Sequence, residues 1–182
     1  MPQHSTRSNS VQFDIFNIMV DTPRFIADAM LGSLARWLRI IGCDTLYFRA
    51  IEDAELVRIA KQEGRILLSK DNVLCRSRRT GESLLIRSDK TLEQLKEVVE
   101  AFNISCYANA MHKRCTLCNG ILVHVERSSV HAEVPDYVFQ RNDAFLKCGE
   151  CGKVYWEGSH RAAMFETLAA VIKDTENTGD IA

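Results

Sequence analysis

The sequence predicts an α/β layer domain with a mostly parallel sheet, followed by a small β-rich unit and a C-terminal helix. Short β-rich runs alternate with helical stretches over residues 23–102, and this pattern changes near residues 103–113. Such alternation is typical of βαβ units, whose crossovers are right-handed in nearly all cases. Two Cys-x-x-Cys pairs mark the smaller unit that follows.

The elements of the first unit are predicted from short apolar runs for strands and from apolar residues at helical spacing for helices. The expected strands are 24–28, 45–48, 65–69 and 83–87, and the expected helices are 29–41, 54–63 and 91–102. Gly42 and Gly64 supply stops for the first two helices. Asp53 and Thr91 are placed to cap the second and third.

The second unit carries short β-like runs at GILVHV, DYVFQ and KVYW, with an inserted hairpin or loop expected around residues 127–143. A helix is expected over 161–173, where apolar residues recur at helical spacing, and we expect it to pack back onto the body. The expected organisation is a flexible extension 1–22, an α/β domain 23–110, a ribbon 111–157, a helix 158–173 and a tail 174–182.

Composition and charge exclude few classes of protein. The chain has 182 residues, of which 46% are hydrophobic, as in globular proteins with a buried core. No apolar run approaches the roughly 18 residues that cross a membrane, and the first residues lack the pattern of a secretory signal. Seven cysteines, three of them single, fit a reducing compartment. We therefore expect a cytoplasmic protein without a membrane partner, and a net charge of −1 alone does not decide whether it binds nucleic acid.

Cys115, Cys118, Cys148 and Cys151 form the two Cys-x-x-Cys pairs, and we expect them to bind one structural zinc ion. Each pair makes a tight turn that directs two thiolates at one point, so two pairs complete a tetrahedron. A redox pair fits less well, because thioredoxin-like motifs open a helix within a βαβ unit. Structural disulfides would need an oxidising compartment. Zinc with four thiolate ligands has no open position for a substrate, so catalysis must lie elsewhere.

Three aspartates stand where a parallel sheet binds its ligands, outside the carboxyl ends of the strands. Asp28 ends the first predicted strand, Asp53 begins a helix, and Asp71 follows the third strand. Clustered carboxylates are costly unless a cation holds them, and oxygen ligands suit Mg²⁺ or Mn²⁺. We predict a catalytic metal site at these three residues, able to activate water and to stabilise charge on a phosphodiester. Taken singly, each is also explained as a helix cap or turn residue, and Asp44 and Asp89 could supply an outer ligand.

A basic loop, CRSRRTGES, lies between two predicted strands close to these aspartates. The candidate phosphate-binding residues are Lys70, Arg76, Arg78 and Arg79. Basic side chains of this kind bind a phosphate backbone without reading its sequence. A solvated loop is the simpler alternative, but carboxylates beside a basic loop are a combination that nuclease chemistry can use.

The chain resembles the Mut-seven C-terminal (Mut7-C) RNase domain family over about residues 24–173. The matching stretches are FIADAMLGSLARWLRIIGCDT (25–45), EDAELVRIAKQEGRILLSKD (52–71), LLIRSD (84–89), the two cysteine pairs and KVYWEGSH (153–160). The resemblance implies a PIN-like nuclease fold, with a three-layer parallel-sheet domain and a zinc ribbon at its C-terminal side. One departure is the continuation Asn72-Val73-Leu74, where some relatives have a second acid.

The resemblance further implies a metal-dependent ribonuclease that hydrolyses RNA. Asp28, Asp53 and Asp71 are then the ligands of Mg²⁺ or Mn²⁺, and the basic loop binds RNA. Two alternatives stay open: a catalytically silent RNA- or protein-binding adaptor, and a structural module whose aspartates are helix caps. We expect zinc chelation to unfold residues 111–157, and loss of Mg²⁺ to stop cleavage while leaving the fold intact.

Overall fold

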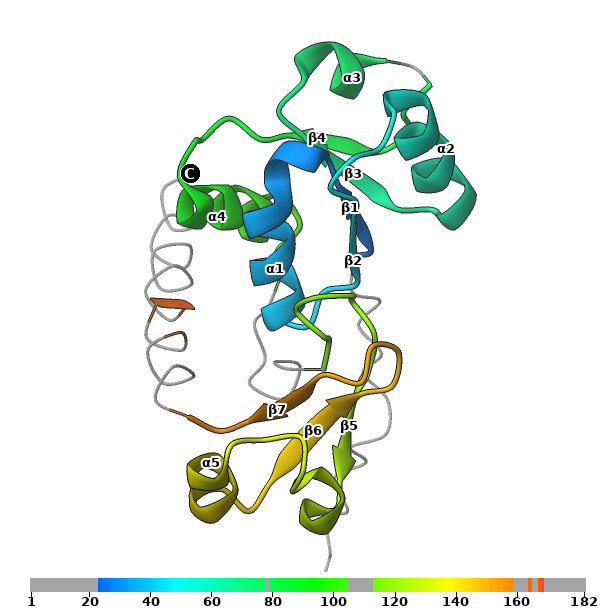
Figure 1. Ribbon diagram of the computed structural model, residues 1–182. Coiled ribbons are helices and arrows are strands. Elements are labelled where there is room, and N and C mark those ends of the chain that lie inside the picture. The colour runs from blue at the N-terminus through cyan, green and yellow to red at the C-terminus, as the bar shows by residue number, and fades with distance from the viewer. Residues whose placement is uncertain (1–22, 78, 105–112, 159–163, 165–166, 169–182) are drawn as a thin grey trace, which may run out of the picture.

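The computed structural model of the protein describes residues 23–77, 79–104, 113–158, 164 and 167–168. It contains a four-stranded parallel sheet and, below it in Figure 1, a three-stranded antiparallel sheet. The predicted fold class, an α/β domain followed by a small β ribbon, is confirmed. None of the helices among these residues is long and apolar enough to cross a membrane.

The elements of the α/β part follow the predicted alternation of strand and helix. They are β1 (Phe25–Ala27), η1 (Ala29–Leu31), α1 (Gly32–Ile40), β2 (Thr45–Tyr47), α2 (Asp53–Glu63), β3 (Ile66–Ser69), α3 (Asn72–Arg76), β4 (Ser83–Leu85) and α4 (Thr91–Ala101). Two details differ from the prediction. The helix expected over 29–41 begins with a separate 3-10 turn that Asp28 caps. The short helix α3, which Asp71 caps, was not expected, and it ends at Arg76, the second residue of the basic loop.

The helix ends agree with the prediction at the glycines but not at the caps. Gly42 (φ 94°) and Gly64 (φ 59°) take the left-handed conformation just after α1 and α2, which glycine tolerates better than other residues. Asp53 and Thr91 are the first helical residues of α2 and α4, not their caps. An acid in the first turn still favours the helix through its dipole.

The parallel sheet has the order β2-β1-β3-β4. Its register pairs Ala27 with both Tyr47 and Leu68, so β1, β2 and β3 end at nearly the same level. The segments that follow these strands therefore meet at one edge of the sheet. This edge, made of residues 28–30, 48–53 and 69–73, is named the carboxyl edge.

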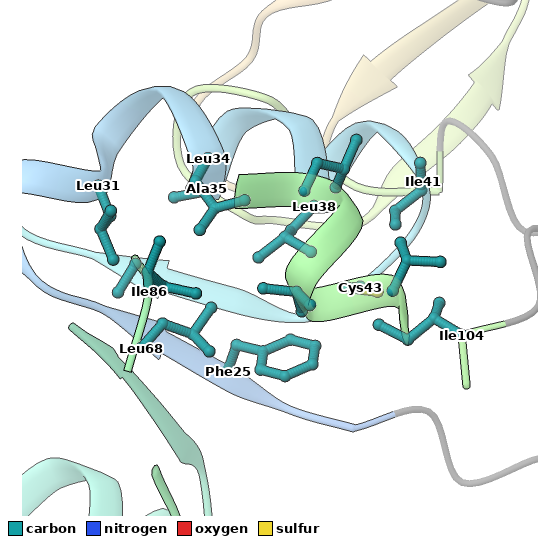
Figure 2. Close-up of a cluster of buried hydrophobic side chains, with 14 of the residues drawn as sticks. Phe25, Leu31, Leu34, Ala35, Leu38, Ile41, Cys43, Leu68, Ile86 and Ile104 are labelled. Carbon is teal, nitrogen blue, oxygen red and sulfur yellow. The ribbon is translucent and has the colours of Figure 1, made fainter. Parts of the chain in front are cut away.

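Helices cover both faces of this sheet and complete three layers. On one face, Phe25, Ala27 and Leu68 pack against α1 and α4 in the main buried cluster (Figure 2). On the other face, Ile26 and Leu67 pack against α2. Both faces are buried, as expected for parallel strands, and each large apolar side chain contributes about 1.5–3 kcal/mol.

The ribbon contains β5 (Leu122–Val125), β6 (Phe145–Cys148) and β7 (Val154–Trp156), with η2 (Arg127–Val130) and α5 (Asp136–Arg141) between β5 and β6. Two expectations were wrong here. The run DYVFQ is helical, not β-like, and the insertion expected as a hairpin or loop holds two short helices. Val130 of η2, Val134 of the link and Val138 of α5 are buried together with Phe145, so the insertion has a small apolar core.

The C-terminal segment reaches back to the α/β part at Leu168. This side chain is 1% exposed and belongs to the main buried cluster, against which Met164 also packs. Both residues are helical, so the expected packing of the last helix onto the body is confirmed at these positions. Most of the helix expected over 158–173, with residues 1–22 and 174–182, lies outside the described residues.

Candidate metal centres

Asp28 and Asp71 are joined through one serine at the carboxyl edge. Ser69, the last residue of β3, donates its hydroxyl to Oδ2 of Asp28 at 2.7 Å and accepts the N–H of Asp71 at 3.0 Å. The N–H of Asp28 donates to the Leu68 carbonyl at 3.0 Å, so the two loops are also tied through the backbone. Ser69 is fully buried. Sequence reasoning missed Ser69, because only the pairing of β1 with β3 brings it to Asp28.

Both aspartates also cap the helical turns that follow them. Oδ1 of Asp28 accepts the Ala29 N–H at 2.5 Å. Oδ1 of Asp71 accepts the N–H of Val73 at 2.6 Å and that of Leu74 at 3.1 Å. Capping alone would account for an aspartate at either position. The capping bonds of Asp71 use only Oδ1, however, so capping and metal binding can share this exposed carboxylate.

Asp53 lies at the same edge but is not part of a cluster of metal-binding size. It begins α2 after the loop that follows β2, and its side chain is exposed. In the part of the chain that the structure describes, only the four cysteines form a group of three or more potential ligands close enough to hold a metal ion. The topology therefore brings Asp28, Asp53 and Asp71 to one edge, and the three-aspartate metal site stays a prediction.

The predicted phosphate-binding residues differ in their surroundings. Lys70 forms an ion pair with Asp89, so its charge is already matched in part. Arg76 ends α3 and Arg79 follows it, and both side chains are exposed. Arg78 lies outside the described residues. Arg76 and Arg79 are thus the candidates best placed to meet a phosphate.

Exposed apolar side chains also gather at the carboxyl edge. Among the described residues of the α/β part, the exposed large hydrophobic side chains are Met30, Phe48, Val73 and Leu92. The first three belong to this edge. The Tyr47 hydroxyl donates to the Ala29 carbonyl at 3.1 Å, which ties the segment of Phe48 to that of Met30. All three side chains thus lie on segments that follow strands of the parallel sheet.

Cys75, on α3, lies close to the same aspartates but is poorly suited to nucleophilic catalysis. Burial raises the pKa of its thiol, and the negative charge of Asp71 raises it further. A thiol with a raised pKa stays protonated near neutral pH, whereas the thiolate is the reactive form. Cys75 is therefore not a candidate nucleophile, and the aspartates are the candidate ligands at this edge.

The four cysteines of the ribbon converge on one point. Their Sγ atoms all lie within 4.8 Å of one another. Cys115 and Cys151 have their sulfurs 3.6 Å apart, and Cys118 and Cys148 have theirs 3.4 Å apart. Tetrahedral zinc, with Zn–S bonds of about 2.3 Å, places its sulfurs about 3.8 Å apart. A disulfide joins its sulfurs at about 2.05 Å, so the cluster fits zinc and does not fit disulfides.

Tight backbone turns direct these sulfurs inward. The Asn119 N–H donates to the Cys115 carbonyl at 2.9 Å, and the Gly152 N–H donates to the Cys148 carbonyl at 3.0 Å. Asn119 (φ 71°) and Gly152 (φ 74°) take the left-handed conformation that closes each turn. A Cβ atom on Gly120 would lie 2.8 Å from the Cys148 sulfur. The absence of a side chain at Gly120 therefore lets the two turns approach.

Tyr155 is a further residue of this centre, which the sequence analysis did not single out. Its hydroxyl accepts the Thr116 N–H at 3.2 Å and lies 3.0 Å from the Cys115 sulfur. Burial raises the pKa of the Cys115 thiol, but hydrogen bonds from Tyr155 and from the backbone outweigh this and lower the pKa to about 6. Burial and the neighbouring thiols raise the pKa of Cys118 to about 12, so Tyr155 favours the thiolate at Cys115 in particular.

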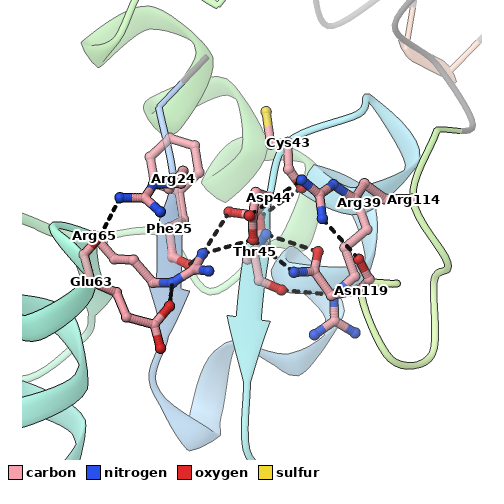
Figure 3. A network of polar contacts seen from close by, with 10 residues as sticks. All are labelled: Arg24, Phe25, Arg39, Cys43, Asp44, Thr45, Glu63, Arg65, Arg114 and Asn119. Atoms are coloured by element: carbon pink, nitrogen blue, oxygen red, sulfur yellow. Dashed lines mark hydrogen bonds and ion pairs between the residues drawn. The ribbon is translucent and has the colours of Figure 1, made fainter. Parts of the chain in front are cut away.

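A polar network joins the ribbon to the α/β part at the amino end of β2, away from the carboxyl edge (Figure 3). Oδ1 of Asp44 accepts from Arg65 and from Asn119, both at 2.7 Å, and Oδ2 accepts from Arg114 at 3.2 Å. Burial raises the pKa of Asp44, but these partners more than offset it, so the pKa lies below its ordinary value. The idea that Asp44 is an outer ligand of the aspartate site is therefore wrong, because it precedes its strand.

The chain is similar to known proteins over most of its described length. The family model described as Mut7-C RNAse domain matches residues 23–168, which include both the carboxyl edge and the four cysteines. The chain is also 33% identical over 101 residues to a human protein named Exonuclease mut-7 homolog. This match covers 53% of the chain but only 12% of that relative, so the chain corresponds to a small part of it.

Proposed function

The chain belongs to the Mut7-C RNAse domain family, and on this premise we propose that it is a metal-dependent ribonuclease. The proposed reaction is hydrolysis of an RNA phosphodiester bond at the carboxyl edge. The observation that carries the proposal is that the buried Ser69 hydroxyl holds the Asp28 carboxylate beside the segment of Asp71, donating to Oδ2 of Asp28 and accepting the Asp71 backbone N–H. The contact with Oδ2 is additional to the cap that Asp28 makes through Oδ1, so capping alone does not account for it.

We assign Asp28, Asp53 and Asp71 as the ligands of one Mg²⁺ or Mn²⁺ centre, since these ions prefer carboxylate oxygens. When bound, such an ion activates water and stabilises the charge that develops on the phosphate. The protein's part is to hold its carboxylates in place. Ser69 orients Asp28, and the first N–H groups of α3 orient Asp71.

RNA as the partner is supported by the groups around these aspartates. Arg76 and Arg79 are exposed cations that can contact phosphates. Met30, Phe48 and Val73 present apolar surface on which bases can rest. Stacking of a base on an aromatic side chain contributes about 1–3 kcal/mol. Groups suited to phosphates and groups suited to bases thus flank the proposed metal ligands.

The ribbon is proposed to bind one structural zinc ion through Cys115, Cys118, Cys148 and Cys151. The sulfur spacing of this cluster supports the assignment. With four sulfur ligands the ion has no open position, so its binding free energy stabilises the fold and takes no part in hydrolysis. Zinc binding and RNA hydrolysis are therefore assigned to separate centres.

Cleavage of labelled RNA with Mg²⁺, Mn²⁺ or EDTA tests the ribonuclease. We expect cleavage with either ion, none with EDTA, and a rate lower by about 100-fold or more for Asp71→Asn, since charge stabilisation by a metal is worth several kcal/mol. Asparagine is also a good helix cap, so this change removes the charge while keeping the start of α3. Asp143→Asn, at an exposed position of the ribbon, is the matched control and should cleave as the wild type does.

A catalytically silent RNA- or protein-binding adaptor is the second candidate. It is favoured by the finding that no three carboxylates of the described residues form a metal-sized cluster. If the wild type binds RNA but cleaves none of the RNAs tested with either metal, the adaptor replaces the ribonuclease. If Asp71→Asn leaves both cleavage and Mn²⁺ binding unchanged, the aspartate site is assigned wrongly.

A further inference from the structure

Arg39 is a buried cation at the junction of α1, β2 and the first cysteine turn (Figure 3). Its Nε donates to the Thr45 carbonyl at 2.9 Å. Its Nη1 donates to the carbonyls of Thr116 and Leu117 at 3.2 Å and 3.0 Å. The residue is 4% exposed, and its hydrogen bonds within the described part of the chain go to these carbonyls, not to a carboxylate. Burying a cation with only dipoles as partners is costly.

The cysteine cluster lies directly beyond these carbonyls and can supply negative charge. Thr116 and Leu117 stand between Cys115 and Cys118, so the guanidinium faces the backbone of one metal-binding turn. Burial lowers the pKa of Arg39, and the negative charges of Cys115, Cys118 and Asp44 oppose this effect. One Zn²⁺ with four thiolates carries a net charge of about −2, whereas each thiol that keeps its proton in the metal-free cluster carries none. Zinc loading would therefore increase the negative charge that faces Arg39.

The same turn is attached to the parallel sheet at a second point. Asn119 accepts the Thr45 N–H at 3.0 Å and donates to Asp44 at 2.7 Å, and it is 6% exposed. Asp44 also accepts from Arg65 and Arg114. With Arg39, three guanidinium groups converge on this junction. Asp44 is shared by Arg65, Arg114 and Asn119, and Glu63 also pairs with Arg65. Three cations thus face two carboxylates next to the cysteine cluster.

We propose that Arg39 is the charge partner of the zinc–thiolate centre, and that zinc loading thereby stabilises the β1–β2 end of the parallel sheet. The proposal rests on the zinc site assigned above and not on the ribonuclease. Coupling of this kind is reciprocal: if zinc favours the intact junction, the intact junction favours zinc. Stabilisation by zinc would reach beyond the ribbon, residues 111–157, because Asn119 bonds the Thr45 N–H of β2. Next to it, the Phe25 N–H of β1 donates to the Asp44 carbonyl at 2.7 Å.

Hydrogen exchange of the full wild-type chain tests how far the effect of zinc reaches. Zinc-loaded and zinc-free protein are compared under reducing conditions, which keep the cysteines as thiols. We expect the amides of Phe25 and Thr45 to exchange at least about tenfold faster without zinc. The Ile86 amide, bonded to the Ser69 carbonyl at the opposite end of the sheet, should change less. Equal exchange at Phe25 and Thr45 in the two forms would overturn the proposal.

Zinc affinity of two glutamine variants tests the role of Arg39 itself. Competition with a chromophoric chelator should show Arg39→Gln binding zinc about tenfold more weakly than the wild type, within the usual range for coupled sites. Arg36→Gln removes an exposed charge from the same helix and should bind zinc as the wild type does. Arg39→Lys keeps the charge and should retain most of the affinity. Wild-type affinity in Arg39→Gln would contradict the charge-partner role.

Urea unfolding separates this role from a merely structural one. A structural Arg39 would lower the free energy of unfolding equally with and without zinc, and equal losses overturn the proposal. A charge partner lowers it more in the zinc-loaded form. If Arg39→Gln does not fold, the affinity of Arg39→Lys and the exchange of the wild type decide the matter. If the wild-type chain binds no zinc at all, the assigned zinc site fails, a result that the affinity measurement shows by itself.

Discussion

Ser69 shows how one buried side chain links two candidate ligands. Its hydroxyl donates to Asp28 and accepts from the Asp71 backbone, so both of its hydrogen-bonding functions are used. Leaving a buried hydroxyl without partners costs about 1–3 kcal/mol. The serine is therefore tolerated in the core because the aspartates satisfy it, and it in turn restricts where Asp28 can point.

Replacing Ser69 by alanine should weaken the metal site. Asp28 loses its donor and the Asp71 N–H loses its acceptor, so we expect Mn²⁺ affinity and RNA cleavage to fall by about tenfold or more, as for other groups that orient metal ligands. Calorimetric titration of the full chain with Mn²⁺ measures the affinity. Ser33→Ala, at an exposed position on α1, is the control. Unchanged Mn²⁺ affinity in Ser69→Ala would mean that the serine serves only the fold.

Asp44 should make the stability of the protein sensitive to acid. Its pKa is lower in the folded state than in the unfolded state, so it stabilises the fold above about pH 4, and this contribution is lost as the pH falls through the folded pKa. Asp44→Asn should cost about 1–3 kcal/mol at pH 7, because buried Arg65 loses one of its two carboxylate partners and keeps only Glu63. Urea unfolding at several pH values should show the difference from wild type shrinking below about pH 4. A difference that stays constant with pH would contradict this account.

At the level of elements, the ribbon depends on the close approach of two turns. The first turn runs from Cys115 to Gly120 and the second from Cys148 to Gly152. The Cys115 N–H donates to the Gly120 carbonyl at 2.7 Å, and the Gly149 N–H donates to the Ile121 carbonyl at 3.2 Å, so each turn has backbone support. The insertion between β5 and β6 adds a small apolar core of its own.

Two glycines of these turns provide a matched pair of variants. A Cβ on Gly120 would lie 2.6 Å from Cγ of Glu150 and 2.8 Å from the Cys148 sulfur, so Gly120→Ala must push the turns apart. We expect its zinc affinity to fall by about tenfold or more. A Cβ on Gly149 would meet no atom within 4 Å, so Gly149→Ala should bind zinc normally. Competition with a chelator measures both affinities, and equal values for the two variants would count against this geometry.

At the level of the whole molecule, the aspartates of the carboxyl edge and the junction with the ribbon lie at opposite ends of the parallel strands. The aspartates follow the strands at the carboxyl edge, and the ribbon is joined at the amino end through Asp44 and Thr45. The C-terminal segment then returns to the α/β part, where Leu168 enters the main buried cluster. The core of the proposed nuclease domain is therefore completed by residues that follow the ribbon in the sequence.

Leu168→Ala should destabilise the α/β domain even though Leu168 is distant from it in sequence. The side chain is 1% exposed, and truncation of a buried leucine costs about 2–5 kcal/mol. Urea unfolding measures the loss. Leu92→Ala, at a position that is 37% exposed, should cost less than about 1 kcal/mol. Wild-type stability in Leu168→Ala would mean that the segment does not pack there in solution.

Spacing along the chain was enough to predict the four strands and three main helices of the α/β part, the four cysteines as one group, and the carboxyl-edge position of Asp28 and Asp71. These features depend on neighbours in sequence, because strand direction, helical periodicity and Cys-x-x-Cys turns are local. The run DYVFQ was predicted wrongly, since short apolar runs do not distinguish strand from helix.

The partners of Ser69, Arg39 and Tyr155 could not be read from the sequence. Each depends on which strands pair and on contacts between residues about 40 to 80 positions apart, such as Ser69 with Asp28 and Arg39 with Leu117. Asp44 resembled the other aspartates in sequence, but it precedes its strand and so lies at the opposite end of the sheet. Burial makes these contacts important for stability, because a polar group removed from water must find its hydrogen-bond partner within the fold.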